Sequence, residues 1–324
     1  MLQPLNIGIL DLCKRSDEKS AACSMRESIE LACIADRAGF KRYWIAEHHT
    51  DDAAQACPEV LLPLLCSSTK TIRIGSGGVL LKYQSPLKIC ETFLAIEALF
   101  PGRIDLGICK GPGVTCQQTA EALVCGNPWE LSDEAFEQKA DDLVRFLWAA
   151  AMEKPRSPEI VTPFPWGVSP PPLWILGSGS HSAKLAARLG RPYGFTLLFD
   201  PKGFYGRDLM AQYHREFVPS AECPAPQSLI VAFIVCSESS GEAERQNRKL
   251  LEYGYQPGNV VGNPKQCCEQ LHQLAHDYQS REVLAATLIE RFEDRAYLYS
   301  ALSEELHLAD RTKPSGSMPS EQAC

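Results

Sequence analysis

Apolar runs alternate with helix-forming segments along almost the whole chain, and this alternation limits the fold more than any other feature. The first run, LNIGIL (5–10), precedes an amphipathic segment, SMRESIELACIADRAG (24–39), that stops at a glycine. The runs are continuously apolar, as in strands of a parallel sheet that is buried on both faces. The expected strands are 5–10, 42–46, 72–81, 103–109, 173–177, 193–199, 228–236 and 282–289.

Eight strand–helix units in succession predict an α/β fold in which a parallel sheet is joined by helical crossovers. Eight is also the number of strands that closes into a (β/α)8 TIM barrel. No change of composition marks a second domain, so residues 1–309 are expected to form one barrel. The proline-rich stretch 155–172 is predicted to be a long excursion between the fourth and fifth strands, and the polar tail 310–324 to be disordered.

Composition and charge exclude several classes of protein. The net charge of −8 argues against a general nucleic-acid binder, because little here would replace the counterions on phosphate. The N-terminus lacks the pattern of a signal peptide, and no apolar segment is long enough to span a bilayer. The 14 cysteines contain no C-x-x-C pair, so they are expected to be reduced thiols in a cytoplasmic protein.

Polar and small residues follow the expected strands at the points where a barrel gathers its active site. A carboxylate, two histidines, a thiol, a lysine and three clusters of small residues would meet at one rim. They occupy positions 10–11, 47–49, 75–78, 109–111 and 177–179. Near His181, the hydroxyls of Ser178 and Ser182 and the first amides of a helix would form an anion site that the helix dipole favours.

The stretch WILGSGSHSAKLAARLG (174–190), followed by Asp200, is close to a dinucleotide fingerprint. Its glycines would form a tight turn, and the acid would bind a ribose. However, serine stands at position 182, where the fingerprint needs its third glycine, and four strand–helix units precede the turn. An NAD-dependent enzyme that relies on Asp200 therefore remains an alternative to a phosphate site of another kind.

Four segments together resemble the bacterial luciferase-like flavin monooxygenases, and they occur in the order of that family. They are RYWIAEHH, IRIGSGG, SPLKICETFLAIEALFPGRIDLGICKG and LWILGSGSHSAKLAARLG. The resemblance runs from about residue 5 to about residue 308. It implies a (β/α)8 barrel that receives reduced FMN from a separate flavin reductase. In the family, reduced FMN reacts with oxygen to give a hydroperoxide, which attacks a small organic substrate.

The resemblance also implies roles for individual residues. His48 matches a histidine that acts near the flavin as a base or hydrogen-bond donor, and Cys109 matches a cysteine beside the reactive flavin carbon. Lys110 takes the place of an arginine that neutralises the FMN phosphate. The other implied cofactor-binding residues are the phosphate turn with its helix start, and a glycine pair that can form a cis peptide under the flavin ring: Gly177, Ser178, Gly179, Ser182, Gly77 and Gly78.

Two adjacent histidines, His48 and His49, follow the second strand. Neighbouring residues of a strand point to opposite sides, so only one of the two rings is expected to face the site. We assign His48 to the site and His49 to packing behind it. Glu47 is expected either to orient a histidine or to pair with an arginine of the barrel.

The substrate is left open by the sequence. The segment YGFTLLFDPKGF (193–204) departs from the more polar ending of this strand in many relatives, so no particular substrate is carried over. An apolar lining is expected from Trp44, Phe195, Leu198 and Phe199, which suggests a hydrophobic organic substrate.

Two alternatives share the predicted fold: a deazaflavin-dependent dehydrogenase, and a flavin-binding partner subunit without turnover. The resemblance also admits a homodimer. No metal site is expected, because HQLAH (272–276) has Gln273 where the zinc-protease motif needs a glutamate.

Overall fold

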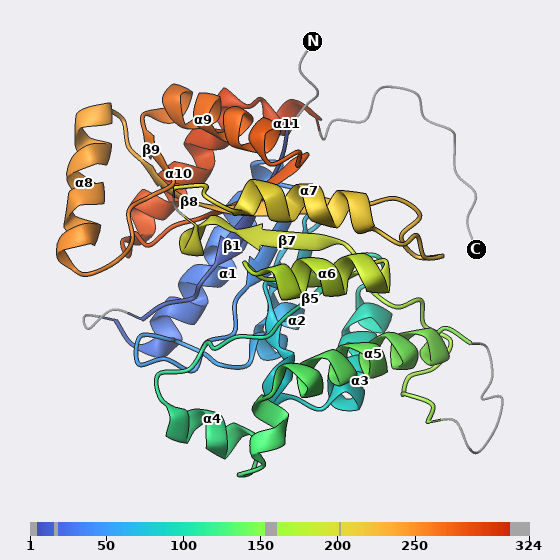
Figure 1. Cartoon of the computed structure of the whole chain (residues 1–324). Helices are drawn as coiled ribbons and strands as arrows, with labels where there is room; N and C mark the ends of the chain where they lie inside the picture. Colours follow the sequence, from blue (N-terminus) through green and yellow to red (C-terminus); the bar gives the residue numbers. More distant parts are fainter. Residues whose placement is uncertain (1–4, 16–18, 153–160, 201, 312–324) are drawn as a thin grey trace, which may run out of the picture.

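The computed structural model describes residues 5–15, 19–152, 161–200 and 202–311. Parallel strands close into one barrel, confirming the predicted fold, and helices surround it (Figure 1). The ring closes where β10 pairs with β8, with Val283 opposite Ile230. The barrel strands in chain order are β1 (Asn6–Asp11), β2 (Arg42–Ile45), β3 (Arg73–Ser76), β5 (Ile104–Cys109), β6 (Leu173–Leu176), β7 (Tyr193–Thr196), β8 (Ser228–Cys236) and β10 (Glu282–Ala286).

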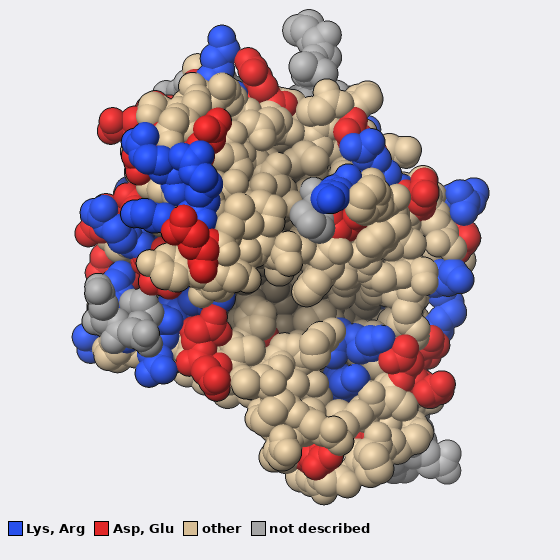
Figure 2. Space-filling view, turned by 60° about the vertical axis from the view of Figure 1, so that its left-hand side comes forward, with Lys and Arg blue, Asp and Glu red and all other residues tan. Residues whose placement is uncertain are grey.

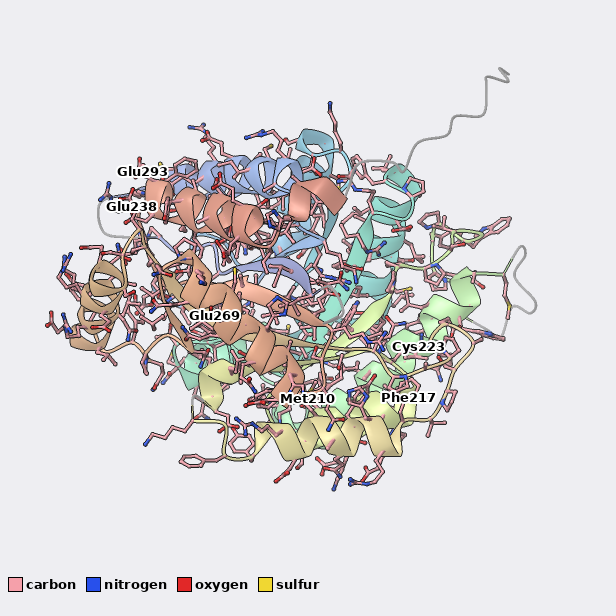
Figure 3. All side chains as sticks on the ribbon, turned by 90° about the horizontal axis from the view of Figure 1, so that it is seen from above. Met210, Phe217, Cys223, Glu238, Glu269 and Glu293 are labelled. Atoms are coloured by element: carbon pink, nitrogen blue, oxygen red, sulfur yellow. The ribbon has the colours of Figure 1, made fainter. Side chains whose placement is uncertain are left out.

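Amphipathic helices cover the outside of the barrel, as the 3.6-residue spacing of their apolar residues requires. The helices are α1 (Ala21–Arg37), α2 (Pro58–Ser68), α3 (Pro86–Leu99), α4 (Gln117–Leu123), α5 (Asp133–Ala150), α6 (Ser180–Leu189), α7 (Gly206–Glu216), α8 (Ser240–Glu252), α9 (Pro264–Asp277), α10 (Phe292–Glu305) and α11 (Leu308–Arg311). On α7, Met210 is fully buried and Phe217 packs on Tyr213 along the side that faces the sheet (Figure 3). None of the described helices is long and apolar enough to cross a membrane.

Local capping sets where several helices begin. The hydroxyl of Ser20 accepts the amide of Cys23 at 3.2 Å, so α1 starts before the predicted position 24. At α9, Asn263 and Gln266 form a reciprocal capping box, each side chain accepting the other residue's amide. These caps satisfy amides that the helix itself leaves without partners.

Three predicted strands were wrong in their extent, and in the simplest case the predicted strand 282–289 ends at Ala286. The run 72–81 is broken, because β3 ends at Ser76, the Gly77–Gly78 peptide is cis, and β4 (Val79–Leu80) pairs separately with β5. The run 193–199 leaves the sheet after Thr196 and turns into the 3-10 helix η3 (Leu197–Phe199). Both breaks lie at the carboxyl ends of barrel strands.

The connections hold more structure than the alternation predicted. A short strand, β9 (Val260–Gly262), pairs with β8 and separates α8 from α9. The polar segment after β5 contains α4 and the 3-10 helix η2 (Pro128–Leu131). Residues 155–160 of the predicted excursion (155–172) and residues 312–324 of the predicted tail (310–324) lie outside the described residues.

The described cysteines carry free thiols, as expected. Only part of them fill the core, however: Cys23, Cys57, Cys116 and Cys125 are exposed.

A buried ion network fills the amino-terminal half of the barrel. Arg42 is only 4% exposed; its guanidinium contacts Asp105 at 2.6 Å and also binds Glu282. Asp105, itself fully buried, also accepts hydrogen bonds from Arg73 at 2.9 Å and from the Trp44 indole at 3.0 Å. Buried charges persist only when they are paired and hydrogen-bonded in this way.

We predict that Asp105→Asn destabilises the fold by about 3 kcal/mol, because the buried Arg42 guanidinium keeps only Glu282 as a charged partner and Arg73 loses its own. The matched control is Asp141→Asn, which breaks a 2.9 Å pair with Arg188 whose two side chains are 42% and 49% exposed. The control is expected to cost less than about 1 kcal/mol. Urea unfolding followed by circular dichroism measures both, and equal losses of stability would contradict a structural role for the network.

Candidate active site

A cavity opens at the carboxyl ends of the barrel strands, where the molecular face is hollowed near its centre (Figure 2). It contains about 1300 Å³ of space, its open mouth included. The nine residues to which the sequence assigned a catalytic or cofactor-binding role all line this cavity: His48, Gly77, Gly78, Cys109, Lys110, Gly177, Ser178, Gly179 and Ser182. The structure therefore brings together side chains and turns from β2, β3, β5 and β6.

Backbone forms one wall of the cavity. The cis peptide between Gly77 and Gly78 lies between β3 and β4, as the resemblance predicted. A Cβ on Gly78 would come within 2.8 Å of the carbonyl oxygen of Gly107, so only glycine fits so close to β5. A flat ligand can approach such a wall without meeting side chains.

Cys109 ends β5 beside this wall, and its thiol lies 3.6 Å from the carbonyl oxygen of Gly78. Burial raises the pKa of the Cys109 thiol to about 12, with the carboxylate of Glu47 acting in the same direction. The thiol is therefore protonated at neutral pH, which excludes a thiolate nucleophile at this position.

The two histidines separate as expected, with His48 lining the cavity, although both lie beyond the end of β2. Burial lowers the pKa of His48 below its ordinary value of 6.5, and the charge of Lys14 lowers it further. The imidazole is then neutral near pH 7 and can accept or donate one hydrogen bond.

His49 turns away from the cavity and belongs to a supporting network. Its Nε2 lies 3.0 Å from the carboxylate of Glu47, which also accepts the amide of Leu80 at 2.8 Å and the side chain of Gln84 at 3.2 Å. The His49 amide donates to the carbonyl oxygen of Gly113. Glu47 thus orients His49 and fixes β4, while the backbone of His49 binds the loop after β5.

One end of the cavity is polar and suited to an anion. Helix α6 begins at Gly179, which has no side chain to cap the first turn, and no acid occupies that turn. A Cβ on Gly179 would meet nothing within 4 Å, so the helix start faces open space. Lys110 and His181 line the same end. The Ser182 hydroxyl was expected to form part of the anion site. In the structure it donates a hydrogen bond to the carbonyl oxygen of Gly179 at 2.9 Å.

The other part of the cavity is apolar. Of the four apolar residues that the sequence predicted for its lining, two lie there. Leu198 and Phe199 line the cavity, but Trp44 and Phe195 do not. Trp44 is fully buried in the barrel beneath Gly77, against Trp174. Phe195 points out of the barrel and stacks on Tyr278.

Several lining residues were missed. Within the continuously apolar runs of β2 and β8, the sequence alone does not show which residues point inward. Strand parity from His48 would have found Ala46. No pattern in the sequence indicated that the ring of Phe136, on α5, lines the cavity. The main missed residues are Leu12, Ala46, Phe136, Gly194, Val231 and Phe233.

The carboxylate of Asp200 accepts hydrogen bonds from its own loop and does not line the cavity. It is 2% exposed, and its carboxylate accepts the amides of Phe204, Tyr205 and Gly206 at the start of α7. The ribose contact that the dinucleotide interpretation required is therefore wrong for this acid.

The motif HQLAH lies on α9, where the side chain of His276 is 81% exposed. Within the described ranges, no group of three or more His, Cys, Asp or Glu side chains is arranged to hold a metal ion.

Comparison with known proteins gives one family. The model of the luciferase-like monooxygenase family matches residues 5–290 of the chain. The chain is 32% identical to YceB of Bacillus subtilis (strain 168), over 93% of this chain and 99% of that protein. It is 36% identical to the luciferase-like monooxygenase of Escherichia coli (strain K12), over 73% of this chain and 68% of that one. The crystal structure of apo-MsnO8 superposes with a TM-score of 0.83 at 30% identity, covering 94% and 99% of the two chains.

These matches span the barrel and the cavity at its rim, and they agree with the family that the sequence motifs indicated. The chain belongs to the luciferase-like monooxygenase family and is a flavin-dependent monooxygenase.

Proposed function

We propose that the chain binds reduced FMN in this cavity and uses molecular oxygen to oxygenate a small, apolar organic substrate. A separate flavin reductase would deliver the reduced FMN. The observation that carries the proposal is the joining of three parts in one cavity: an uncapped helix start with Lys110, a glycine wall, and a neutral histidine.

The residues of the polar end fit a phosphate. The first amides of α6 have no capping side chain, and the helix dipole favours an anion at this position. Lys110 supplies a positive charge at the same end. Gly177 allows the turn to close, because a Cβ there would lie 2.4 Å from the Ser182 hydroxyl oxygen.

The remaining part of the cavity suits a flat ring, because glycine backbone lines one side of it. The ring would lie along Gly77, Gly78 and Cys109, with His48 at its edge. The apolar side, with Leu198, Phe199, Val231 and Phe233, would hold the substrate and exclude water.

Reduced FMN supplies two electrons to oxygen, so that one oxygen atom passes to the substrate and the other leaves as water. The chain's own part is to hold and shield the reactants. Neutral His48 can accept or return a proton at its imidazole nitrogen, and the protonated Cys109 thiol adds no charge next to the ring.

The decisive experiment mixes the protein anaerobically with reduced FMN and then with oxygenated buffer in a stopped-flow spectrometer. Reoxidation of bound flavin much more slowly than in free solution would support the proposal. Reoxidation at the rate of free flavin would contradict it. A parallel titration with the deazaflavin F420 tests the dehydrogenase alternative, which tight F420 binding without FMN binding would favour.

We predict that Lys110→Ala weakens FMN binding by about tenfold, because a hydrogen bond to a charged group is lost. The affinity for riboflavin, which has no phosphate, is expected to stay the same. The control is Lys184→Ala, an exposed lysine on the same helix as the phosphate turn that does not line the cavity. Fluorescence titration measures all three proteins, and an equal loss for riboflavin would show that Lys110 does not bind the phosphate.

We predict that the rate constant for reoxidation of bound reduced FMN changes with pH through His48. Because the pKa of His48 is lowered, the neutral ring persists through the neutral range and is protonated only below the ordinary value of 6.5. The acid limb of the profile should lie there, and His48→Asn should remove it and change the rate at neutral pH at least about tenfold.

The matched control for this profile is His214→Asn. Burial also lowers the pKa of His214, but its ring contacts Ser228 and does not line the cavity. If His48→Asn retains the acid limb while His214→Asn loses it, His48 is not the group that titrates.

A further inference from the structure

A carboxylate binds the lysine at the polar end of the cavity and lies near a histidine there. Asp133, the first residue of α5, lies 2.9 Å from the ammonium of Lys110 through Oδ1. Its Oδ2 lies 4.0 Å from Nδ1 of His181. The hydrogen bond from Lys110 keeps the pKa of Asp133 below its usual value, so the acid is ionised at neutral pH.

The two partners of Asp133 are the residues that line the polar end. Lys110 comes from the end of β5, and His181 from the first turn of α6. Phe136, one turn after Asp133 on α5, lines the cavity as well. The start of α5 therefore borders the same space as the start of α6, and Asp133 lies where its charge opposes an anion bound there.

We infer that Asp133 competes with the cofactor phosphate for Lys110 and His181, and so weakens flavin binding. This inference rests on the proposed function. When the phosphate binds, it replaces Asp133 as the ion-pair partner of Lys110. When the flavin leaves, the pair between Lys110 and Asp133 forms again. Binding is reduced by the fraction of molecules in which Lys110 is already paired.

The size of the effect follows from exposure. The side chain of Asp133 is 52% exposed and that of Lys110 is 36% exposed. Water and salt screen pairs of this kind, which makes the competition modest and reversible. A weak hold suits a reduced flavin that arrives from a reductase and leaves oxidised after each turnover.

Asp133 also has an ordinary structural explanation, because an acid in the first turn of a helix interacts favourably with the helix dipole. Glu134 is a second acid in the first turn of α5, and it is exposed. It shares the helix and the charge of Asp133, but the contacts with Lys110 and His181 are made by Asp133. Glu134→Gln is therefore the matched control for helix dipole and net charge.

The test measures the dissociation constants of FMN and riboflavin by fluorescence titration of the full chain at low salt. Asp133→Asn is expected to bind FMN about two- to fivefold more tightly than wild type, with riboflavin unchanged. Asp133→Glu, which keeps the charge, and Glu134→Gln should stay close to wild type. The gain should shrink when salt is added.

Unchanged or weaker FMN binding by Asp133→Asn would overturn the inference, as would an equal gain for riboflavin. Thermal unfolding of each variant shows whether the fold is kept, and Asp133→Ser provides a second neutral variant. If wild type and all variants bind no FMN, the proposed function fails and this inference fails with it. If wild type binds FMN and Asp133→Asn binds it no better, only the competition is disproved.

Discussion

The buried guanidinium of Arg42 is the constraint on which the layers above it depend. Asp105 and Glu282 neutralise it inside the barrel, and the indoles of Trp44 and Trp174 lie over its charge, with centroids 5.3 and 4.9 Å away. The Trp44 ring in turn fills the space beneath Gly77, where a Cβ would come within about 3 Å of it. Charge, aromatic layer and glycine wall therefore form a stack, and the cavity begins where the stack ends.

The cavity combines two environments because neighbouring strands end differently. After β5 and β6 the chain continues into Lys110 and into the uncapped start of α6, which gives a polar end. After β7 it turns into η3, which presents Leu198 and Phe199 instead of a polar loop. A cofactor with a charged tail and an uncharged reacting end needs both environments within one molecule's length, and the barrel supplies them from adjacent strands.

The sequence predicted the barrel and the position of the nine assigned residues at its rim, because each of them lies near the end of a strand or in the first turn of the helix after it. It failed where tertiary contacts decide. The run 72–81 looks like one strand, yet Glu47 binds the amide of Leu80 and the chain breaks at the glycines. Phe195 was placed in the cavity because a wholly apolar strand hides which residues point inward. Phe136 lies on α5, away from the strand ends where the sequence predicted the site, and no local pattern indicates that its ring lines the cavity.

The charge at the polar end bears on how a flavin would be used. A site that holds a cofactor permanently gains from several unopposed cations, whereas here Lys110 is paired with Asp133, and Nε2 of His181 lies 3.4 Å from Glu137. Asp133 therefore offsets the charge of Lys110 beside the cavity, and the helix start of α6 contributes only a partial charge. The geometry of the phosphate end is thus kept while its net attraction is reduced. Such a balance favours exchange of a bound anion over its retention, as the proposed delivery of reduced FMN by a separate reductase would require.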